Sequence, residues 1–295
     1  NGLSGVADRD MDSEQAWDLT RGTISTITLV MDDGCQTNHP DLPWLDGRDF
    51  TTGASGGSGN GSHSTSCENH GTAVAGCVAA LMNNGLGTVG TAPGTQVIVA
   101  KMADLDADTP CGTSLDAYSP TWVVNALNWG RSRGARVTNA SFTVGQDDAV
   151  ADMYTSTWNS GLVHFASAGN GGSDSIGDPQ VGFPSNSANV ISVAALQPNG
   201  TLTSFSNYGT GLDLSAPGTA VWSTDRTGSA GYNNGGDYTW FGGTSAASPL
   251  SAGVAALFFS QHPFATAAQC RDAIFNSCDD LGTPGIDTSY ARGFI

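Results

Sequence analysis

In Phe241-Gly-Gly-Thr-Ser-Ala-Ala-Ser-Pro249, a glycine turn leads into small and apolar residues that continue to Phe259. Glycine permits a tight turn and lets a bound molecule approach the backbone closely. The apolar run predicts a buried helix after the turn, with Ser245 near its positive N-terminal end, where a nucleophile beside a developing anion is favoured. Serine and threonine also cap helices routinely. Capping by Thr244 or Ser245 is therefore the alternative to a nucleophilic role.

Short apolar runs of strand length recur along the chain and alternate with helix-like segments. The runs are Ile27–Met31, Gln96–Lys101, Arg136–Ser141, Leu162–Ala166 and Val190–Ala195. Between two of them, the segment from Ser119 to Trp129 has a cap serine, a proline at the first helical position and apolar residues at helical spacing. This alternation predicts an α/β fold, a three-layer sandwich with a mostly parallel central sheet covered by helices on both faces. A length of 295 residues suits one domain over residues 1–295.

Two further segments end or begin regular elements with chemically active side chains. Ile27-Thr-Leu-Val-Met-Asp32-Asp-Gly34 is an apolar strand that ends in carboxylates, and Asn69-His70-Gly71 precedes a helix rich in small residues. Ligands of α/β sheets bind at strand ends. A lone aspartate or histidine there is more often structural, but Asp32, His70 and Ser245 together supply the carboxylate, base and nucleophile of an acyl-transfer triad.

With five blocks in order, the chain resembles the subtilisin-like serine proteases, the subtilases, over nearly its whole length. The blocks are Asp32-Asp-Gly34, His70-Gly-Thr72, Ala168-Gly-Asn170-Gly-Gly172, Ser215-Ala-Pro-Gly218 and Gly243-Thr-Ser-Ala-Ala-Ser-Pro249, in the family's order of Asp, His and Ser. The resemblance implies an endopeptidase that cleaves polypeptides through an acyl-enzyme on Ser245. His70 is then the general base and Asp32 its orienting partner. Asn170 resembles the side-chain donor of the oxyanion hole, although an asparagine before glycines can also simply form a turn.

The resemblance also implies a set of substrate-binding residues. They are Ser141, Phe142, Thr143, Ser167, Ala168, Gly169 and Gly182. Gly182 matches the base of the primary pocket, where a missing side chain favours a large apolar P1 residue, the one before the scissile bond. Thr143 stands where the family commonly has glycine, which leaves the width of the pocket open.

Two alternatives to a broad apolar protease are considered. The segments Met31–Gly34 and Ser141–Asp148 resemble the kexin branch, in which Asp147 or Asp148 would hold an arginine and the enzyme would cut after basic residues. The other alternative is an inactive subtilase-fold binding module, against which the joint presence of Asp32, His70, Asn170 and Ser245 argues.

Calcium is the cofactor that the resemblance implies. Asp41 matches a family position that gives a carboxylate to calcium, and Leu81–Thr88 is the partner loop. The expected ligands are Asp41, Leu81, Asn84 or its neighbour Asn83, Leu86 and Thr88. Such an oxygen-only set is what calcium prefers, although asparagine and glycine also mark an ordinary helix-end loop. The alternating acids of Asp8–Asp12 and Asp104–Asp108 are equally compatible with a cation site or with plain surface acidity.

Composition favours a secreted protein. There are 27 acidic and 10 basic residues, a net charge of −17, which excludes ordinary nucleic-acid binding. No apolar run is long enough for a membrane span. A start at Asn1 without a leader predicts a mature form, and the resemblance implies a removed inhibitory propeptide and a monomer.

The cysteines also favour an oxidising compartment. They are even in number and lack zinc-type spacing, which predicts disulfides and leaves 15 possible connectivities. Cys270 with Cys278 is the pair that we expect first among these. The six residues are Cys35, Cys67, Cys77, Cys111, Cys270 and Cys278.

Overall fold

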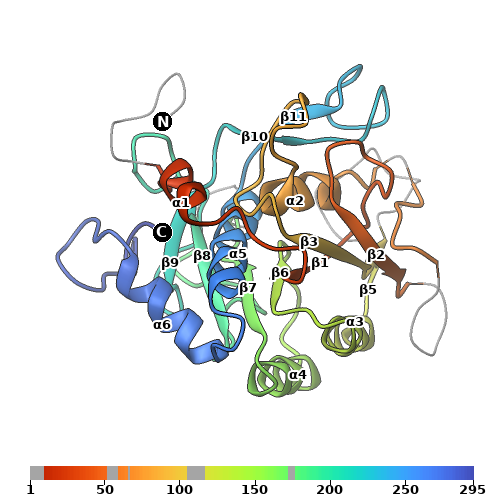
Figure 1. The fold of residues 1–295 in the computed structure, drawn as a ribbon. Coiled ribbons are helices and arrows are strands. Elements are labelled where there is room, and N and C mark those ends of the chain that lie inside the picture. The colour runs from red at the N-terminus through yellow and green to blue at the C-terminus, as the bar shows by residue number, and fades with distance from the viewer. Residues whose placement is uncertain (1–9, 52–58, 66, 105–116, 172–176) are drawn as a thin grey trace.

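The computed structural model describes residues 10–51, 59–65, 67–104, 117–171 and 177–295 (Figure 1). The predicted acidic runs around Asp8 and Asp106 lie mostly outside these residues, as does Cys111. The helices are α1 (Ser13–Leu19), α2 (His70–Ala79), α3 (Pro120–Ser132), α4 (Asp148–Asn159), α5 (Thr244–Gln261) and α6 (Ala267–Ser277). The strands are β1 (Ile27–Asp32), β2 (Trp44–Asp49), β3 (Gln96–Lys101), β4 (Ala103–Asp104), β5 (Ala117–Tyr118), β6 (Val137–Ala140), β7 (Val163–Ser167), β8 (Val190–Leu196), β9 (Leu214–Pro217), β10 (Val221–Thr224) and β11 (Tyr238–Phe241).

Seven strands form the central sheet in the order β2-β3-β1-β6-β7-β8-β9, and every neighbouring pair is parallel. The chain passes from β1 to β3 on one side and later to β6 on the other. The carboxyl end of β1 therefore lies at a point where the strand order reverses, which is where α/β sheets bind ligands.

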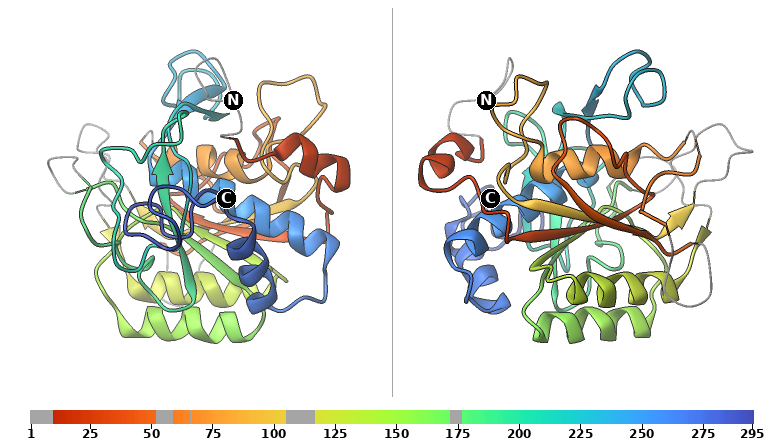
Figure 2. Two further views of the ribbon diagram at one scale, coloured as in Figure 1. Left: turned by 90° about the vertical axis from the view of Figure 1, so that its left-hand side faces the viewer. Right: turned by 45° about the vertical axis from the view of Figure 1, so that its right-hand side comes forward.

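Helices cover both faces of this sheet, which confirms the predicted three-layer arrangement (Figure 2). In β1, Leu29 and Met31 pack in the core beneath α3 and α4, whereas Val30 packs against α2 on the opposite face. The helix α5 covers β6 to β9 on the same side as α2. The strands are buried on both faces because their side chains alternate between two helical layers.

The five predicted strands are present within one or two residues of their expected bounds, and the predicted helix after Ser119 is α3. The predicted buried helix is α5, which starts at Thr244, directly after the glycine turn, and contains Pro249. Strands β2, β4, β5 and β9 to β11 were not predicted. All of them except β2 have only two to four residues. β2 has six residues, but it carries charged residues at an edge of the sheet, so no apolar run marks it.

The predicted pairing of Cys270 with Cys278 is wrong, because both cysteines are free. Cys270 lies inside α6 and Cys278 directly follows it, so eight residues of helical rise, about 12 Å, separate them along the axis. A disulfide needs Cα atoms within about 7 Å. Cys35 and Cys77 are also free, whereas Cys67 is disulfide-bonded.

Candidate active site

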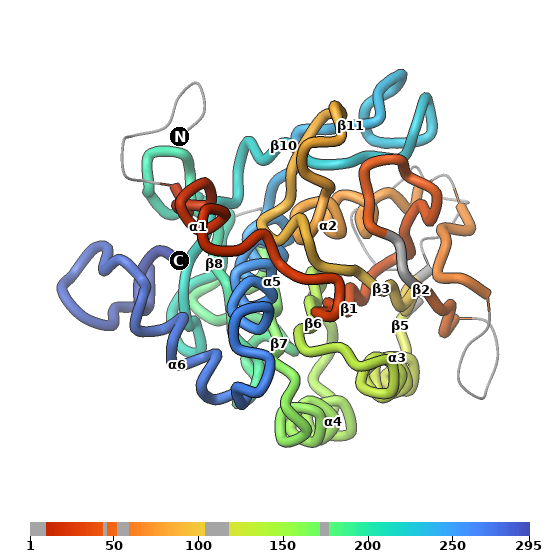
Figure 3. Tube along the Cα trace, in the orientation of Figure 1, coloured from red at the N-terminus to blue at the C-terminus, as the bar shows by residue number. Residues whose placement is uncertain are grey.

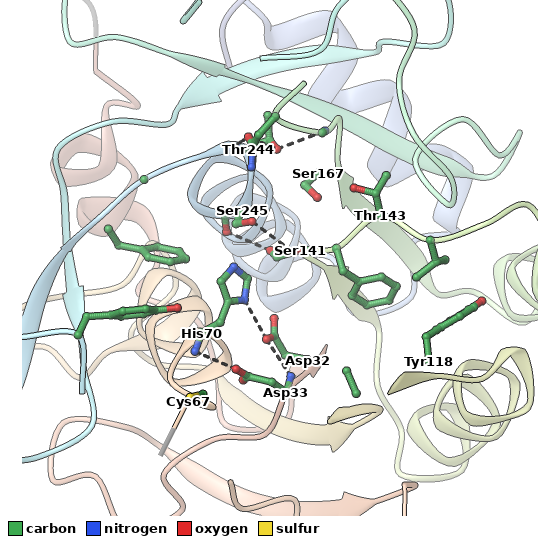
Figure 4. A pocket seen from close by; sticks show the side chains of 18 of the residues that line it. Asp32, Asp33, Cys67, His70, Tyr118, Ser141, Thr143, Ser167, Thr244 and Ser245 are labelled. Carbon is green, nitrogen blue, oxygen red and sulfur yellow. Dashed lines mark hydrogen bonds and ion pairs between the residues drawn. The ribbon is translucent and has the colours of Figure 1, made fainter. Parts of the chain in front are cut away.

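A cleft of about 830 Å³ opens at the carboxyl ends of the central strands. It joins the end of β1, the start of α2, the end of β6 and the start of α5, four segments far apart in the sequence (Figure 4). Asp32, His70, Asn170 and Ser245 all line it. The structure thus brings together the four residues predicted to be catalytic.

Buried Asp32 and partly exposed His70 form a hydrogen-bonded pair in the cleft. Asp32 Oδ1 lies 2.9 Å from His70 Nδ1 and also accepts the N–H of Asp33 at 2.9 Å. The His70 side chain is 27% exposed, so its other edge faces the cleft. Burial alone lowers the pKa of His70, but the charge and hydrogen bond of Asp32, together with the charge of Asp33, outweigh burial and raise it to about 9.

Asp33 is a second buried carboxyl group at this site, which the sequence analysis did not assign. Its two oxygens accept the first backbone N–H groups of α2, from His70 at 3.1 Å and from Gly71 at 2.8 Å. Asp33 thereby fixes the backbone of His70. Desolvation and the adjacent charge of Asp32 raise the pKa of Asp33 to about 8. Its position after Asp32 in the sequence was the available signal.

The chain's only lysine is also part of this region. Lys101, paired in register with Asp32, lies in β3 with its ammonium group 2.7 Å from Glu68, and both side chains are fully buried. Lys101 also donates to the carbonyl oxygen of Asp33. A buried ion pair of this kind is costly to break on one side only. It therefore ties the end of β3 to the segment before His70.

Ser245 lies in the first turn of α5, and Gly243 rather than a hydroxyl residue occupies the N-cap position. The capping alternative is therefore not what the structure has. Pro249 has no N–H, so the Ser245 carbonyl lacks its intrahelical donor. The Ser141 hydroxyl replaces that donor at 3.0 Å, and the Ser245 hydroxyl donates to the Ser141 carbonyl at 3.2 Å. These two bonds attach the start of α5 to the end of β6.

Two N–H donors lie close together at the start of α5, the amide of Asn170 and the backbone N–H of Ser245. Asn170 Oδ1 accepts from the backbone N–H and the hydroxyl of Thr244, both at 2.9 Å, which orients the Asn170 amide nitrogen. A β-carbon at Gly243 would lie 3.3 Å from that nitrogen and 3.6 Å from the backbone nitrogen of Ser245. Gly243 has φ +93°, a conformation that also requires glycine. Among the described groups, none accepts the N–H of Ser245, so both donors are available to a ligand.

The predicted substrate-binding residues lie in two cavities, apart from Ala168. Ser141, Phe142, Thr143, Ser167 and Gly169 line the cleft. Ala168 is fully buried in a small core cluster. Gly182 lines a separate cavity of about 500 Å³, which Thr143 and Gly169 also line.

Thr143 accounts for this division. A β-carbon at Gly182 would lie only 1.8 Å from Thr143 Cγ2, so the threonine methyl occupies the space that the missing side chain of Gly182 leaves. Gly182 is consequently absent from the lining of the cleft. Asp147 and Asp148 do not line it either, and Asp147 instead caps α4 by accepting the N–H of Val150.

Of the predicted calcium ligands, Asn84 and Thr88 contact the carboxylate of Asp41, which is fully buried, and Leu81 donates its N–H to the Asp41 backbone carbonyl at 3.0 Å. Asn84 Nδ2 donates to the carboxylate at 2.6 Å and Thr88 N at 3.3 Å, and no ion pair of the described residues includes it. The described residues contain no cluster of three or more His, Cys, Asp or Glu that could hold a metal. The expected site does not require one, because it uses a single carboxylate.

The comparisons with known proteins agree with this geometry. The model of the subtilase family, Peptidase_S8, matches residues 25–293. The chain belongs to the subtilase family. Thermitase of Thermoactinomyces vulgaris is 34% identical over 287 residues, covering 95% of this chain and 90% of thermitase. A subtilisin of Bacillus pumilus is 34% identical over 268 residues, covering 90% of this chain and 87% of the subtilisin.

Solved structures of two proteases share the subtilase fold with this chain. Fervidolysin from Fervidobacterium pennivorans, a keratinolytic enzyme related to subtilisin, aligns with a TM-score of 0.81 at 30% identity. The alignment covers 96% of this chain but only 43% of fervidolysin. The S41 psychrophilic protease aligns with a TM-score of 0.78 at 26% identity, covering 98% and 99% of the two chains. This subtilase is accordingly a subtilisin-like serine endopeptidase, and its substrates are polypeptides.

Proposed function

We propose that this endopeptidase cleaves peptide bonds through an acyl-enzyme on Ser245. The Ser245 oxygen attacks the scissile carbonyl while His70 Nε2 takes its proton, and His70 then protonates the leaving amine. Water then attacks the acyl-enzyme carbonyl while His70 takes a proton from it. His70 returns that proton to the Ser245 oxygen as the carboxylic acid product is released. Asp32 keeps the Nδ1 proton on the imidazole and stabilises the imidazolium.

The observation that carries this proposal is the 2.9 Å contact between Asp32 and His70 at the same cleft as Ser245. The Ser245 hydroxyl now donates to the Ser141 carbonyl. To react, it must rotate towards the His70 ring, which lies next to Ser245 (Figure 4). The Asn170 amide and the Ser245 N–H would then stabilise the oxyanion, where preorganised donors act most strongly.

For the primary pocket, the proposal is an apolar site whose depth is limited by Thr143. The cleft wall contributes Phe142 and Val144, and no acidic side chain from Asp147 or Asp148 reaches it. This supports an apolar P1 residue over the kexin-like alternative. Because the Thr143 methyl fills the space before Gly182, the preferred P1 residue is smaller than the sequence alone predicted.

Calcium at Asp41 is also proposed. A fully buried carboxylate without a cationic partner is costly unless a cation lies near it. The carbonyl oxygens of Leu81, Leu86 and Thr88 accept no hydrogen bond from the described residues, so they are available as ligands. Asn84 now presents its nitrogen to Asp41. Its amide would have to turn over to offer an oxygen, and the two orientations are nearly isosteric.

The proposal also covers the form of the protein. The chain is a single catalytic domain that is secreted as a monomer after a propeptide is removed. Among the described helices, none has the length and apolarity needed to cross a bilayer. The net charge of −17 would keep an exported protein soluble through mutual repulsion.

Labelling with a fluorophosphonate tests the proposal, because only an activated serine reacts. Wild-type protein should be labelled on Ser245 and should lose its peptidase activity in proportion. Ser245→Ala should abolish both while leaving the circular dichroism spectrum unchanged. Ser251→Ala is the matched control, since Ser251 is a buried serine of the same helix whose hydroxyl donates to the Ala247 carbonyl. An unlabelled wild-type protein would favour the inactive binding module.

A further inference from the structure

Asn207 is a buried polar residue that has no part in the chemistry above. It lies between β8 and β9, and only 6% of it is exposed. It does not line the cleft, but it lines the neighbouring cavity of about 500 Å³ together with Asn170. A buried amide is costly unless its polar atoms are hydrogen-bonded, so the partners of Asn207 show what it holds.

Asn207 bonds to the chain on both sides of Asn170. Its backbone N–H donates to the Gly169 carbonyl at 2.9 Å, and its Oδ1 accepts the N–H of Gly171 at 2.7 Å. That carbonyl and that N–H belong to the two peptide units that join Asn170 to its neighbours. Because each peptide unit is planar, the two bonds fix the backbone from which the Asn170 side chain extends.

The backbone around Asn170 does not hold this conformation by itself. Gly169 and Gly171 both have positive φ, +110° and +73°, and glycine is the residue with the greatest conformational freedom. Asn207 Oδ1 also accepts the N–H of Asp178 at 2.9 Å, so the same oxygen joins a segment further along the chain. A β-carbon at Gly169 would lie 2.5 Å from Asn207 Nδ2, which shows how closely the two residues pack.

Thr244 holds the other end of Asn170. The N–H and the hydroxyl of Thr244 donate to Asn170 Oδ1, both at 2.9 Å. Asn170 follows β7, Asn207 follows β8 and Thr244 begins α5, and these three elements pack against one another (Figure 3). The Asn170 amide is therefore fixed at its side chain by one segment and at its backbone by another.

We propose that Asn207 is a positioning residue for the oxyanion donor. It holds the Asn170 backbone so that the amide nitrogen points at the developing oxyanion, and it does not touch the substrate itself. The proposal rests on the acyl-enzyme function above and adds to the oxyanion site a residue that acts only through Asn170. Oxyanion donors act within a narrow range of distances, and a misplacement of about 1 Å costs about 10²-fold in rate.

A double-mutant cycle with Asn170 tests this role. Asn207→Ala should lower kcat by about tenfold to about 10²-fold with KM nearly unchanged, because the donor acts only in the transition state. In the Asn170→Leu background the same substitution should change kcat by no more than about twofold, since no donor remains to be positioned. A general loss of folding would instead lower activity by the same factor in both backgrounds.

Three further variants accompany the cycle. Asn207→Asp keeps an oxygen acceptor of the same shape, so it should retain more of kcat than Asn207→Ala. Asn207→Ser, whose oxygen lies one bond closer to the backbone, takes the place of Asn207→Ala in the cycle if that variant does not fold. Asn199→Ala is the matched control, because Asn199 Oδ1 also accepts a backbone N–H, that of Thr201, but lines neither cavity, so kcat should equal that of wild type.

Equal kcat in wild type, Asn207→Ala and Asn207→Ser would overturn the proposal. A loss that is just as large in the Asn170→Leu background, or one confined to KM, would also overturn it. If Asn170→Leu by itself leaves kcat unchanged while the fluorophosphonate still labels Ser245, the oxyanion role of Asn170 has failed, which is a failure of the proposed function.

Discussion

Removing the methyl group of Thr143 should enlarge the primary pocket. Thr143→Ser deletes Cγ2, the atom that lies 1.8 Å from a β-carbon position at Gly182. Thr143→Gly deletes all of the side chain and should join the cleft of about 830 Å³ to the neighbouring cavity of about 500 Å³. A P1 phenylalanine would then reach Gly182.

The expected size follows from what apolar pockets discriminate, about 1–3 kcal/mol for each methylene-sized group. At about 1.4 kcal/mol for each factor of ten, Thr143→Ser should raise the ratio of kcat/KM for Phe over Ala at P1 about tenfold. Thr143→Gly should raise it further, about a hundredfold. The gain should come from the Phe substrate, with the Ala substrate little changed.

The assay measures kcat/KM for matched peptides with Ala, Leu, Phe and Arg at P1. Thr143→Val is the matched control, because it keeps both branches of the side chain and loses only the hydroxyl, so its profile should equal that of wild type. The reasoning is refuted if wild type already prefers Phe to Ala by tenfold or more, or if Ser and Val at position 143 give the same profile.

Three further predictions concern the reaction and the loop around Asp41. Asn170→Leu should lower kcat about 10² to 10³-fold with KM nearly unchanged, because the amide donor acts on charge present only in the transition state. A change confined to KM would contradict this. Only neutral His70 can accept a proton, so kcat/KM should rise with pH through its raised pKa of about 9. Asp32→Asn should move that rise to lower pH, because it removes the charge and hydrogen bond that raise the pKa, and an unmoved profile would exclude His70 as the titrating base. Finally, EDTA should lower the Tm of wild type but not that of Asp41→Asn. The control Asp148→Asn, which changes an exposed carboxylate, should respond to EDTA as wild type does. A wild-type Tm that EDTA does not change would exclude calcium.

Local sequence patterns were sufficient for the elements that carry the site. The apolar run that ends in Asp32 predicted β1, and the glycine turn before Ser245 predicted a serine at a helix start. The alternation of strand-like and helix-like segments predicted the layers. These features depend on the conformational preferences of neighbouring residues, so they can be recognised without knowing how distant segments meet.

Relations between distant residues were decided by the tertiary structure. Gly182 alone predicted a deep pocket, but the packing of two segments places the Thr143 methyl in that space. Asp33 follows Asp32 in sequence, yet its role is visible only where its oxygens meet the N–H groups of α2. Likewise Cys270 and Cys278 are near neighbours in sequence but are separated by the rise of α6.

The sequence by itself therefore determined the fold class, the family resemblance and the chemical types of the groups at the site. The tertiary structure decided which of those groups lie in contact, which cavity each one faces and how far the pocket extends. The physical reason is that side-chain chemistry and local conformation belong to short segments, whereas distances, burial and pKa values depend on strand order and on the packing of segments that are remote in the chain.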